Sequence, residues 1–506
     1  MPETDALMKS KPQVTASLAF ATLVACFGSI QYGYHMAELN APGQVLSCSK
    51  YEAPWPEMPY DETWLGRHAF KQCIELSEQQ LGLATSIFSI GGLAGSLYAG
   101  RLADRYGRKR YSFVNCVTGI LGSLIIFSAN TYGQLILGRF VVGMCCGSSI
   151  VVTPLYINEM SPKELRGSLG SMNQVCINLG ILLTQLLSLE LADSYRWRWL
   201  LLVGALLALV NLLLLFRIEE SPLWLASQGN LEGAESVLRE LRGGDSRRSR
   251  EEVEEWLTAR GASRNGISYA ASMDGAPLNA RAASQQSSLR SSEEMSTAAK
   301  ISLARYFTDP RYRQSRWAVT AILVSQQFCG INSIIFYGVK VVSGQLPQYA
   351  IVVNFAISIV NVIVTFGASF LVDHWGRKPL LITSAAAMSV ATAFVSGGIV
   401  ANNAGVLVTF TVIYVAVFAI GLGPIPFLVI SELSPPEAGG IAQSYGTTCN
   451  WVATFAVGYG FPLLNAWLQG YVFLIFSAYA AGFAAYVWLK IPETKGKQEE
   501  ELRWRQ

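Results

Sequence analysis

Long apolar segments, separated by shorter polar ones, occupy most of the chain. A helix needs about 20 consecutive apolar residues to cross the hydrocarbon core of a bilayer, and runs of this length predict twelve membrane-spanning helices. They cover residues 17–36, 78–103, 111–129, 133–157, 169–190 and 198–217 before a long polar insert, and 317–338, 348–372, 379–400, 405–431, 442–465 and 469–490 after it. The pattern therefore predicts an all-α integral membrane protein with six spanning helices in each half.

Short polar signatures that follow apolar segments occur twice in the chain. Residues 159–167 (EMSPKELRG) return as 432–440 (ELSPPEAGG), residues 104–109 (DRYGRK) as 373–378 (DHWGRK), and residues 218–221 (IEES) as 491–494 (IPET). Many secondary transporters are built from two such repeats and bind their substrate at the midplane between them. The duplication predicts two pseudo-symmetric six-helix bundles.

The placement of positive charge predicts an orientation. Arg and Lys gather in the loops after the second, fourth and eighth predicted helices and in the insert, so these segments and both termini are expected in the cytoplasm. The expected domains are a cytoplasmic N-terminus (1–16), two bundles (17–217 and 317–490), a cytoplasmic insert (218–316) and a cytoplasmic tail (491–506). A composition of 51% hydrophobic and 14% charged residues fits a membrane protein rather than a soluble domain.

The insert divides by composition. Asn230 is placed to cap a helix over 231–242, because the apolar positions there form one stripe. A second, acidic helix is expected over 250–260. The rest of 243–299 is rich in Ser, Arg, Ala and Gly, which predicts disorder. Its Ser-Arg clusters, such as residues 246–249, suit a kinase, and an unregulated flexible tether explains them equally well.

Two of the nine cysteines share the first loop expected outside the cytoplasm, residues 39–77. A Cys48–Cys73 disulfide is predicted because that loop faces an oxidising compartment, with two free thiols as the alternative. No metal site is expected, since His68 is the one nearby histidine and no ligand spacing is present. The other seven cysteines fall in predicted spans as small packing residues.

The order of several motifs is similar to that of a known family. They are residues 100–109 (GRLADRYGRK), 138–140 (GRF), 159–166 (EMSPKELR), 220–222 (ESP), 326–327 (QQ), 330–332 (GIN), 423–426 (GPIP) and 492–496 (PETKG). Across nearly its whole length the chain resembles the sugar-porter branch of the major facilitator superfamily. The resemblance implies the major facilitator fold and transport by alternating access. Residues 32–42 look most like those of a fungal subgroup that includes proteins associated with the vacuole.

The resemblance also implies a sugar site. Amide side chains suit a sugar because they both donate and accept hydrogen bonds, as its hydroxyls do, and an aromatic face covers the C–H side. The matching contacts are Gln174, Gln326, Gln327, Asn332, Asn361, Asn450 and Trp451, with Phe336 and Tyr337 as gate aromatics. The alternative is that the amides only join helices by hydrogen bonding. Leu323, Phe427 and Ala419 depart from residues common in the family, which leaves the identity of the sugar open.

Conserved charge pairs of the family imply a cytoplasmic salt-bridge network. Arg108 is expected to pair with Glu159, and Arg166 with Glu220, and their counterparts in the second half are Arg377, Glu432 and Glu493. Such pairs close the cytoplasmic side when the carrier opens outward. Gly439 stands where the first repeat has Arg166, and Leu223 replaces an arginine, so the lock is expected to be weaker here.

Energy coupling depends on the first predicted span. Proton-coupled sugar porters place an aspartate after Gly-Tyr and pair it with the arginine of the fourth span, but here Gly33-Tyr34 is followed by His35, and the arginine is Arg139. Glu38, about one turn later, is either a substitute proton carrier or a solvated charge at the rim. The missing aspartate favours facilitated diffusion, and a proton-coupled symporter is the alternative.

The sequence thus favours a secondary transporter of a monosaccharide, either a hexose or a related polyol. A nutrient receptor with little transport is a second alternative, although the polar tail after the last span is short. No enzyme activity and no cofactor are expected, because no nucleotide loop, metal cluster or nucleophile with a base is present. The expected partners are a small sugar or polyol and the bilayer, without nucleic acid, and the expected location is the vacuolar or plasma membrane.

Overall fold

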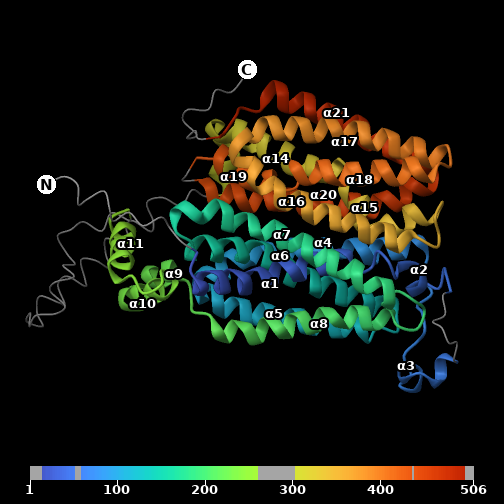
Figure 1. Cartoon of the computed structure of the whole chain (residues 1–506), viewed down its shortest axis with the longest axis horizontal. Coiled ribbons are helices and arrows are strands. Elements are labelled where there is room, and N and C mark those ends of the chain that lie inside the picture. The colour runs from blue at the N-terminus through green and yellow to red at the C-terminus, as the bar shows by residue number, and fades with distance from the viewer. Residues whose placement is uncertain (1–13, 52–58, 260–302, 436–437, 496–506) are drawn as a thin grey trace, which may run out of the picture.

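The computed structural model describes residues 14–51, 59–259, 303–435 and 438–495. Nearly all of its regular structure is helical (Figure 1). The first bundle contains α1 (Ala16–Ala37), α4 (Glu78–Tyr106), α5 (Arg108–Phe127), α6 (Tyr132–Met160), α7 (Arg166–Leu191) and α8 (Trp197–Leu214). The second contains α14 (Arg313–Phe328), α15 (Ile331–Ser343), α16 (Ala350–Trp375), α17 (Arg377–Val400), α18 (Ala404–Ile420), α19 (Ile425–Leu433), α20 (Gly439–Leu468) and α21 (Val472–Lys490).

The described residues contain eleven segments that are long and apolar enough to cross a membrane, and the last, Gly439–Lys490, holds both α20 and α21. Two predicted spans are interrupted: α14 and α15 form one crossing, and α18 and α19 form another. This gives six crossings in each bundle. The structure confirms the predicted all-α fold with two six-helix bundles.

The two ends of the bundles carry different short elements (Figure 1). One end, here called the insert side, carries α9 (Pro222–Ser227), α10 (Leu231–Leu241), α11 (Ser246–Ala259) and α13 (Leu303–Thr308). The other, here called the disulfide side, carries α2 (Gly43–Leu46) and α3 (Trp64–Arg67). Exposed aromatic residues lie near both ends. Trp375 and Trp488 lie on the insert side, and Tyr349 and Trp467 lie on the disulfide side. Aromatic belts of this kind lie at membrane–water interfaces.

The insert helices pack on the first bundle. The Asn230 side chain accepts from the Gly233 N–H at 3.0 Å, so the predicted cap is present and α10 ends one residue early. Helix α11 begins at Ser246, four residues before the predicted start and inside the stretch expected to lack structure. Arg242 donates to the Met160 carbonyl at 2.9 Å, which fastens the insert to the end of α6. The rest of the predicted disordered stretch, 260–299, lies outside the described residues.

Helices within the first bundle approach closely at glycines. A Cβ on Gly33 of α1 would lie 1.8 Å from the Ile177 carbonyl of α7, and one on Gly180 of α7 would lie 2.1 Å from the Ile30 carbonyl of α1. Small residues allow backbones to come this near in a membrane, where packing rather than hydrophobic burial drives association. These contacts fix α7 against α1 and leave its opposite face for the second bundle.

Candidate functional site

Two crossings of the second bundle are broken near their middle. Between α14 and α15, Gly330 has φ +94°, a left-handed conformation that favours glycine. Between α18 and α19 the helix stops at Gly421 and resumes at Ile425 after Pro424. Gln326 and Gln327 lie in the last turn before the first break, and Asn332 lies just after it. Broken helices near the midplane are where secondary transporters bind substrates.

Four of the predicted sugar contacts form one hydrogen-bonded chain. Gln326, just before the α14–α15 break, donates through Nε2 to the carbonyl of Leu422, in the α18–α19 break, at 2.8 Å. This hydrogen bond joins the two breaks. Asn450 Nδ2 donates to Gln326 Oε1 at 2.8 Å, Gln327 Nε2 to Gln326 Oε1 at 3.4 Å, and Asn332 Nδ2 to Gln327 Oε1 at 2.5 Å. All four side chains are buried, and Asn332 Oδ1 has no hydrogen-bond partner. A buried acceptor left without a donor is the position where a hydroxyl would gain most.

Trp451, next to Asn450 in the chain, supplies an aromatic surface at the boundary between the bundles. It follows Asn450 on α20 and lies 5.9 Å from the Tyr32 ring and 6.1 Å from the Phe88 ring, measured between centroids. A Cβ on Gly92 of α4 would lie 2.5 Å from the indole. The second bundle therefore inserts Trp451 into a gap that glycine leaves in the first.

Two predicted contacts lie apart from the amide chain. Asn361 is buried on α16, where its Oδ1 accepts from Asn178 Nδ2 of the first bundle at 3.3 Å. Gln174 is half-buried on α7, and within the described part of the chain no hydrogen bond links it to the four amides. The structure thus brings together Gln326, Gln327, Asn332 and Asn450, with Trp451 next to Asn450 on α20, and leaves Asn361 and Gln174 outside this group.

The predicted gate aromatics lie on α15 of the second bundle. Phe336 and Tyr337 are buried on α15, and Tyr337 Oη donates to the Gly458 carbonyl of α20 at 2.7 Å. Asn40, just after α1, donates to the Ile335 carbonyl at 2.9 Å and accepts from the Val339 N–H at 3.0 Å. These bonds from Asn40 join the first bundle to α15 and hold the bundles together at this end.

Duplicated ion pairs occupy the insert side. Arg108 lies 2.7 Å from Glu159, which also accepts from Ser221 Oγ at 2.5 Å. In the second bundle Arg377 lies 2.9 Å from Glu432, which accepts from Thr494 Oγ1 at 2.5 Å. Each repeat therefore joins an arginine, a glutamate and a hydroxyl from three segments.

The expected Arg166–Glu220 pair is wrong for this structure. Glu220 accepts from the backbone N–H groups of Arg108, at 2.8 Å, and Lys109, at 3.0 Å, so it caps the start of α5. Arg166 donates instead to the Ser161 carbonyl at 3.4 Å. The free N–H groups at a helix start attract a carboxylate, and Glu493 caps α17 in the same way through Arg377 and Lys378 at 3.0 Å.

Three charged or titratable side chains meet inside the first bundle. Glu38 Oε1 lies 2.5 Å from Arg139 Nη1, and its Oε2 lies 2.8 Å from His35 Nδ1. None of the three is more than 1% exposed. Glu38 is therefore not the solvated rim charge that the sequence left open, because both of its oxygens are held by buried partners.

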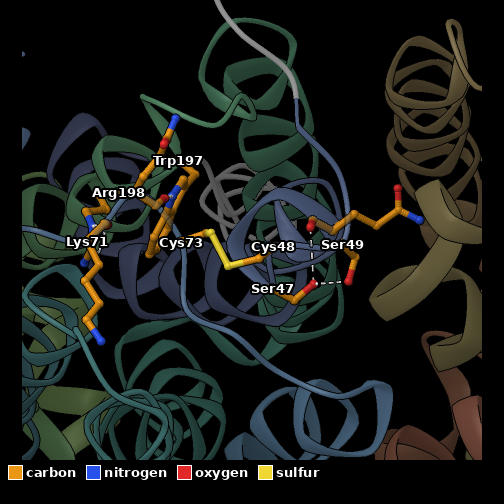
Figure 2. The surroundings of a disulfide bond; sticks show 9 residues. Ser47, Cys48, Ser49, Lys71, Cys73, Trp197 and Arg198 are labelled. Atoms are coloured by element: carbon orange, nitrogen blue, oxygen red, sulfur yellow. Dashed lines mark hydrogen bonds between the residues drawn. A yellow bond between two sulfur atoms is a disulfide. The ribbon is translucent and has the colours of Figure 1, made fainter. Parts of the chain in front are cut away.

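Cys48 and Cys73 form a disulfide on the disulfide side (Figure 2). The Trp197 indole donates to the Gln72 carbonyl at 2.8 Å, and Arg198 donates to the Lys71 carbonyl at 2.9 Å. These bonds fasten the loop to the start of α8. Among the described residues, no group of three or more His, Cys, Asp or Glu is suited to hold a metal ion.

Several functional candidates were not selected from the sequence. Asn178, Thr365 and Asn40 bridge the two bundles, and Ser221 and Thr494 complete the ion pairs. Ser221 and Thr494 stand at matching places in the repeated IEES and IPET signatures, which was a usable signal. Asn178 and Thr365 had none, because a lone polar residue in an apolar span does not reveal its partner.

Comparisons with known proteins agree with this arrangement. The profile of the family described as "Sugar (and other) transporter" matches residues 21–505. The chain is 51% identical to a probable metabolite transport protein of Saccharomyces cerevisiae, covering 100% of this chain and 99% of that protein. It is 45% identical to the vacuolar protein sorting-associated protein 73 of the same yeast, covering 96% of each.

More distant proteins share the same architecture. Facilitated glucose transporter protein 1 of Caenorhabditis elegans is 30% identical, over 97% of this chain and 91% of that protein. A partially occluded, inward-open structure of the E. coli xylose transporter XylE superposes with a TM-score of 0.72 at 23% identity, covering 96% of this chain and 100% of that one. The latter establishes the fold. With a profile match over nearly its whole length, the chain belongs to the sugar transporter family.

Proposed function

We propose that this protein carries a monosaccharide, either a hexose or a related polyol, by facilitated diffusion. The observation that supports this most is the chain of four buried amides at the breaks in α14–α15 and α18–α19, with Asn332 Oδ1 unpaired. Sugar hydroxyls match such groups because both donate and accept. Trp451 provides the aromatic face, and a relative of this chain is described as a facilitated glucose transporter.

The two bundles would alternate access by rocking about this site. In the structure Asn40 and Trp451 hold them together from the middle to the disulfide side. The proposed cycle breaks these contacts to admit sugar from the disulfide side and separates the insert-side ends to release it. The ion pairs around Glu159 and Glu432 keep each bundle rigid while it rocks.

The insert side is proposed to face the cytoplasm, since Arg and Lys gather there. The disulfide on the opposite side agrees, because disulfides persist in oxidising compartments. We place the protein in the vacuolar membrane, on the likeness to a vacuolar protein sorting-associated protein. A kinase would act on Ser246, which is exposed, rather than on Ser249, which is buried and donates to the Asp245 carbonyl at 2.7 Å.

Proton-coupled symport is the second candidate, and the buried Glu38 favours it. A carboxylate held by Arg139 in one state becomes a proton carrier if the cycle separates the two. In the facilitator the pair stays joined throughout, and Glu38 serves only to neutralise Arg139. The two mechanisms therefore differ in whether sugar movement carries protons.

Uptake into proteoliposomes tests both candidates. Radiolabelled hexoses, pentoses and polyols are offered with and without a pH gradient to the wild type, Gln326→Ala and Asn211→Ala. Asn211 is a buried amide inside the first bundle and serves as the control. A facilitator equilibrates sugar, ignores the gradient, and loses about tenfold in apparent affinity in Gln326→Ala but not in Asn211→Ala. Accumulation driven by the gradient, with sugar-dependent alkalinisation that Glu38→Gln abolishes, would establish the symporter.

A further inference from the structure

A polar bridge joins the bundles at the middle of the membrane. Asn178 on α7 of the first bundle donates through Nδ2 to Thr365 Oγ1 at 2.7 Å and to Asn361 Oδ1 at 3.3 Å, both on α16 of the second. Thr365 Oγ1 in turn lies 3.4 Å from Asn361 Oδ1. The three side chains are 3–6% exposed. An amide nitrogen carries two hydrogen atoms that can be donated. The Asn178 amide nitrogen donates to two side chains of the second bundle.

The position of Asn178 is set by its neighbours on α7. Ile177 and Gly180 press against Gly33 and Ile30 of α1, where a Cβ would come within about 2 Å of a backbone carbonyl. Helix α7 therefore cannot turn or withdraw without separating from α1. The Asn178 side chain is therefore carried by a rigid element where it meets α16.

The bridge also uses the side chain of a predicted sugar contact, Asn361. Asn361 Oδ1 receives the Asn178 and Thr365 donors, so the oxygen that would accept from a sugar hydroxyl is already engaged. The amide chain of the site offers a free acceptor on Asn332 instead. A sugar hydroxyl that donates to Asn361 Oδ1 would therefore compete with Asn178 for that oxygen.

We propose that Asn178 is a positioning residue of the transport cycle, which rests on the proposed sugar transport. Its side chain takes the place of the sugar hydroxyl on Asn361 in the empty carrier and holds α7 to α16. Sugar binding displaces it and frees the bundles to rock. Breaking the bridge lowers the free energy needed both to bind sugar at Asn361 and to part the two helices.

The first test measures bundle separation without sugar. Spin labels on Leu189→Cys of α7 and Val352→Cys of α16, two exposed positions near the disulfide side, report the distance in a Cys449→Ser background, because Cys449 is a partly exposed thiol. Asn178→Val is expected to raise the separated population about threefold, the effect of a typical interhelical hydrogen bond in a membrane. The control is Asn211→Val, a buried asparagine inside the first bundle. A distance distribution that matches the control would overturn the proposal.

The second test measures sugar affinity in a double-mutant cycle. Asn178→Val is expected to tighten equilibrium binding about threefold, and Thr365→Val to tighten it less, because the Asn178–Asn361 hydrogen bond remains in that variant. The two effects are expected to be non-additive, since both variants lose the Asn178–Thr365 hydrogen bond. Weaker binding in Asn178→Val would mean that Asn178 contacts the sugar directly, and additive effects would mean that no bridge exists; either refutes the proposal. If the wild type binds no sugar of the panel, the proposed function fails. The distance measurement, which needs no sugar, still shows whether Asn178 holds α7 to α16.

Discussion

Glu38 carries a negative charge that two buried partners share. Arg139 lies 2.5 Å from one oxygen and His35 lies 2.8 Å from the other. His35 in turn packs on Gly204, where a Cβ would come within 2.2 Å of the imidazole. A buried ion pair adds little net stability, but removing one partner is costly because the other charge stays uncompensated. The three residues therefore act as one unit.

Glu38→Gln tests this unit. The change leaves the Arg139 cation buried without its anion and is expected to cost about 3–5 kcal/mol of stability. Thermal unfolding of the detergent-solubilised protein, followed by tryptophan fluorescence, measures the change. The matched control is Glu78→Gln, which removes an exposed pair with Lys340 and should cost less than about 1 kcal/mol. Equal melting temperatures for the two variants would mean that losing the buried Glu38 charge costs no more stability than losing the exposed Glu78 charge, which contradicts the prediction.

At the level of elements, each bundle uses a distant glutamate to start a helix. Gly107 and Gly376, with φ of +97° and +93°, end α4 and α16 and turn the chain directly into α5 and α17. A Cβ on Gly107 would lie 2.3 Å from Glu220, and one on Gly376 would lie 2.8 Å from Glu493. Glycine thus gives the capping carboxylate room to reach the first N–H groups of the next helix.

Glu220→Ala removes the α5 cap. It is expected to cost about 1 kcal/mol, as the loss of a helix cap does, and to speed hydrogen exchange at the amides of Arg108 and Lys109. Glu219→Ala is the control, because Glu219 is exposed and adjacent in the chain. Mass spectrometry of exchanged peptides over 107–112 gives the result. Unchanged protection in Glu220→Ala would exclude the capping role and reopen the question of what Glu220 binds.

The break between α14 and α15 is sensitive to a single methyl group. In Gly330→Ala the new Cβ would lie 2.5 Å from the Phe476 ring, at a φ of +94° that alanine rarely adopts. The expected outcome is a shift of Gln326 relative to Asn332 and loss of most sugar binding. Gly397→Ala, at an exposed helical site with no atom within 4 Å, should bind normally. Normal binding in Gly330→Ala would mean that the break is not needed for the site.

At the level of the whole molecule, the disulfide side combines two functions. Contacts of Asn40 with α15 join the two bundles there. In the described part of the Cys48–Cys73 loop, Trp197 and Arg198 fasten it to the first bundle (Figure 2). The gate and the disulfide therefore belong to separate mechanical parts, so the disulfide should affect stability more than transport.

Cys48→Ser/Cys73→Ser tests this separation. The two cysteines are 25 positions apart, and cross-linking a loop of that size stabilises by about 3 kcal/mol in the chain-entropy account. The variant is expected to melt several degrees lower and to transport at a near-normal rate at low temperature. Reductant should lower the melting temperature of the wild type but not of the variant. A variant that melts normally but has lost transport would place the disulfide in the gate.

Hydrophobic periodicity and repeated signatures in the sequence determined the twelve crossings and the two bundles. They succeeded because span length is set by the bilayer and not by tertiary contacts. Family motifs also selected Gln326, Gln327, Asn332 and Asn450, which do meet; the first three lie beside Gly330, which breaks the helix. The alternatives for Glu38 could not be separated in this way, because burial depends on neighbours that are remote in the chain.

Only the tertiary structure decided which polar groups pair. Glu220 was expected on Arg166, but it caps α5, because folding brings it nearer to two free backbone N–H groups than to that guanidinium. Asn178 forms hydrogen bonds with Thr365 and Asn361, which lie 183 or more positions away in the sequence. A hydrogen bond requires its atoms within about 3 Å, and such distances between segments are fixed by how the helices and bundles pack.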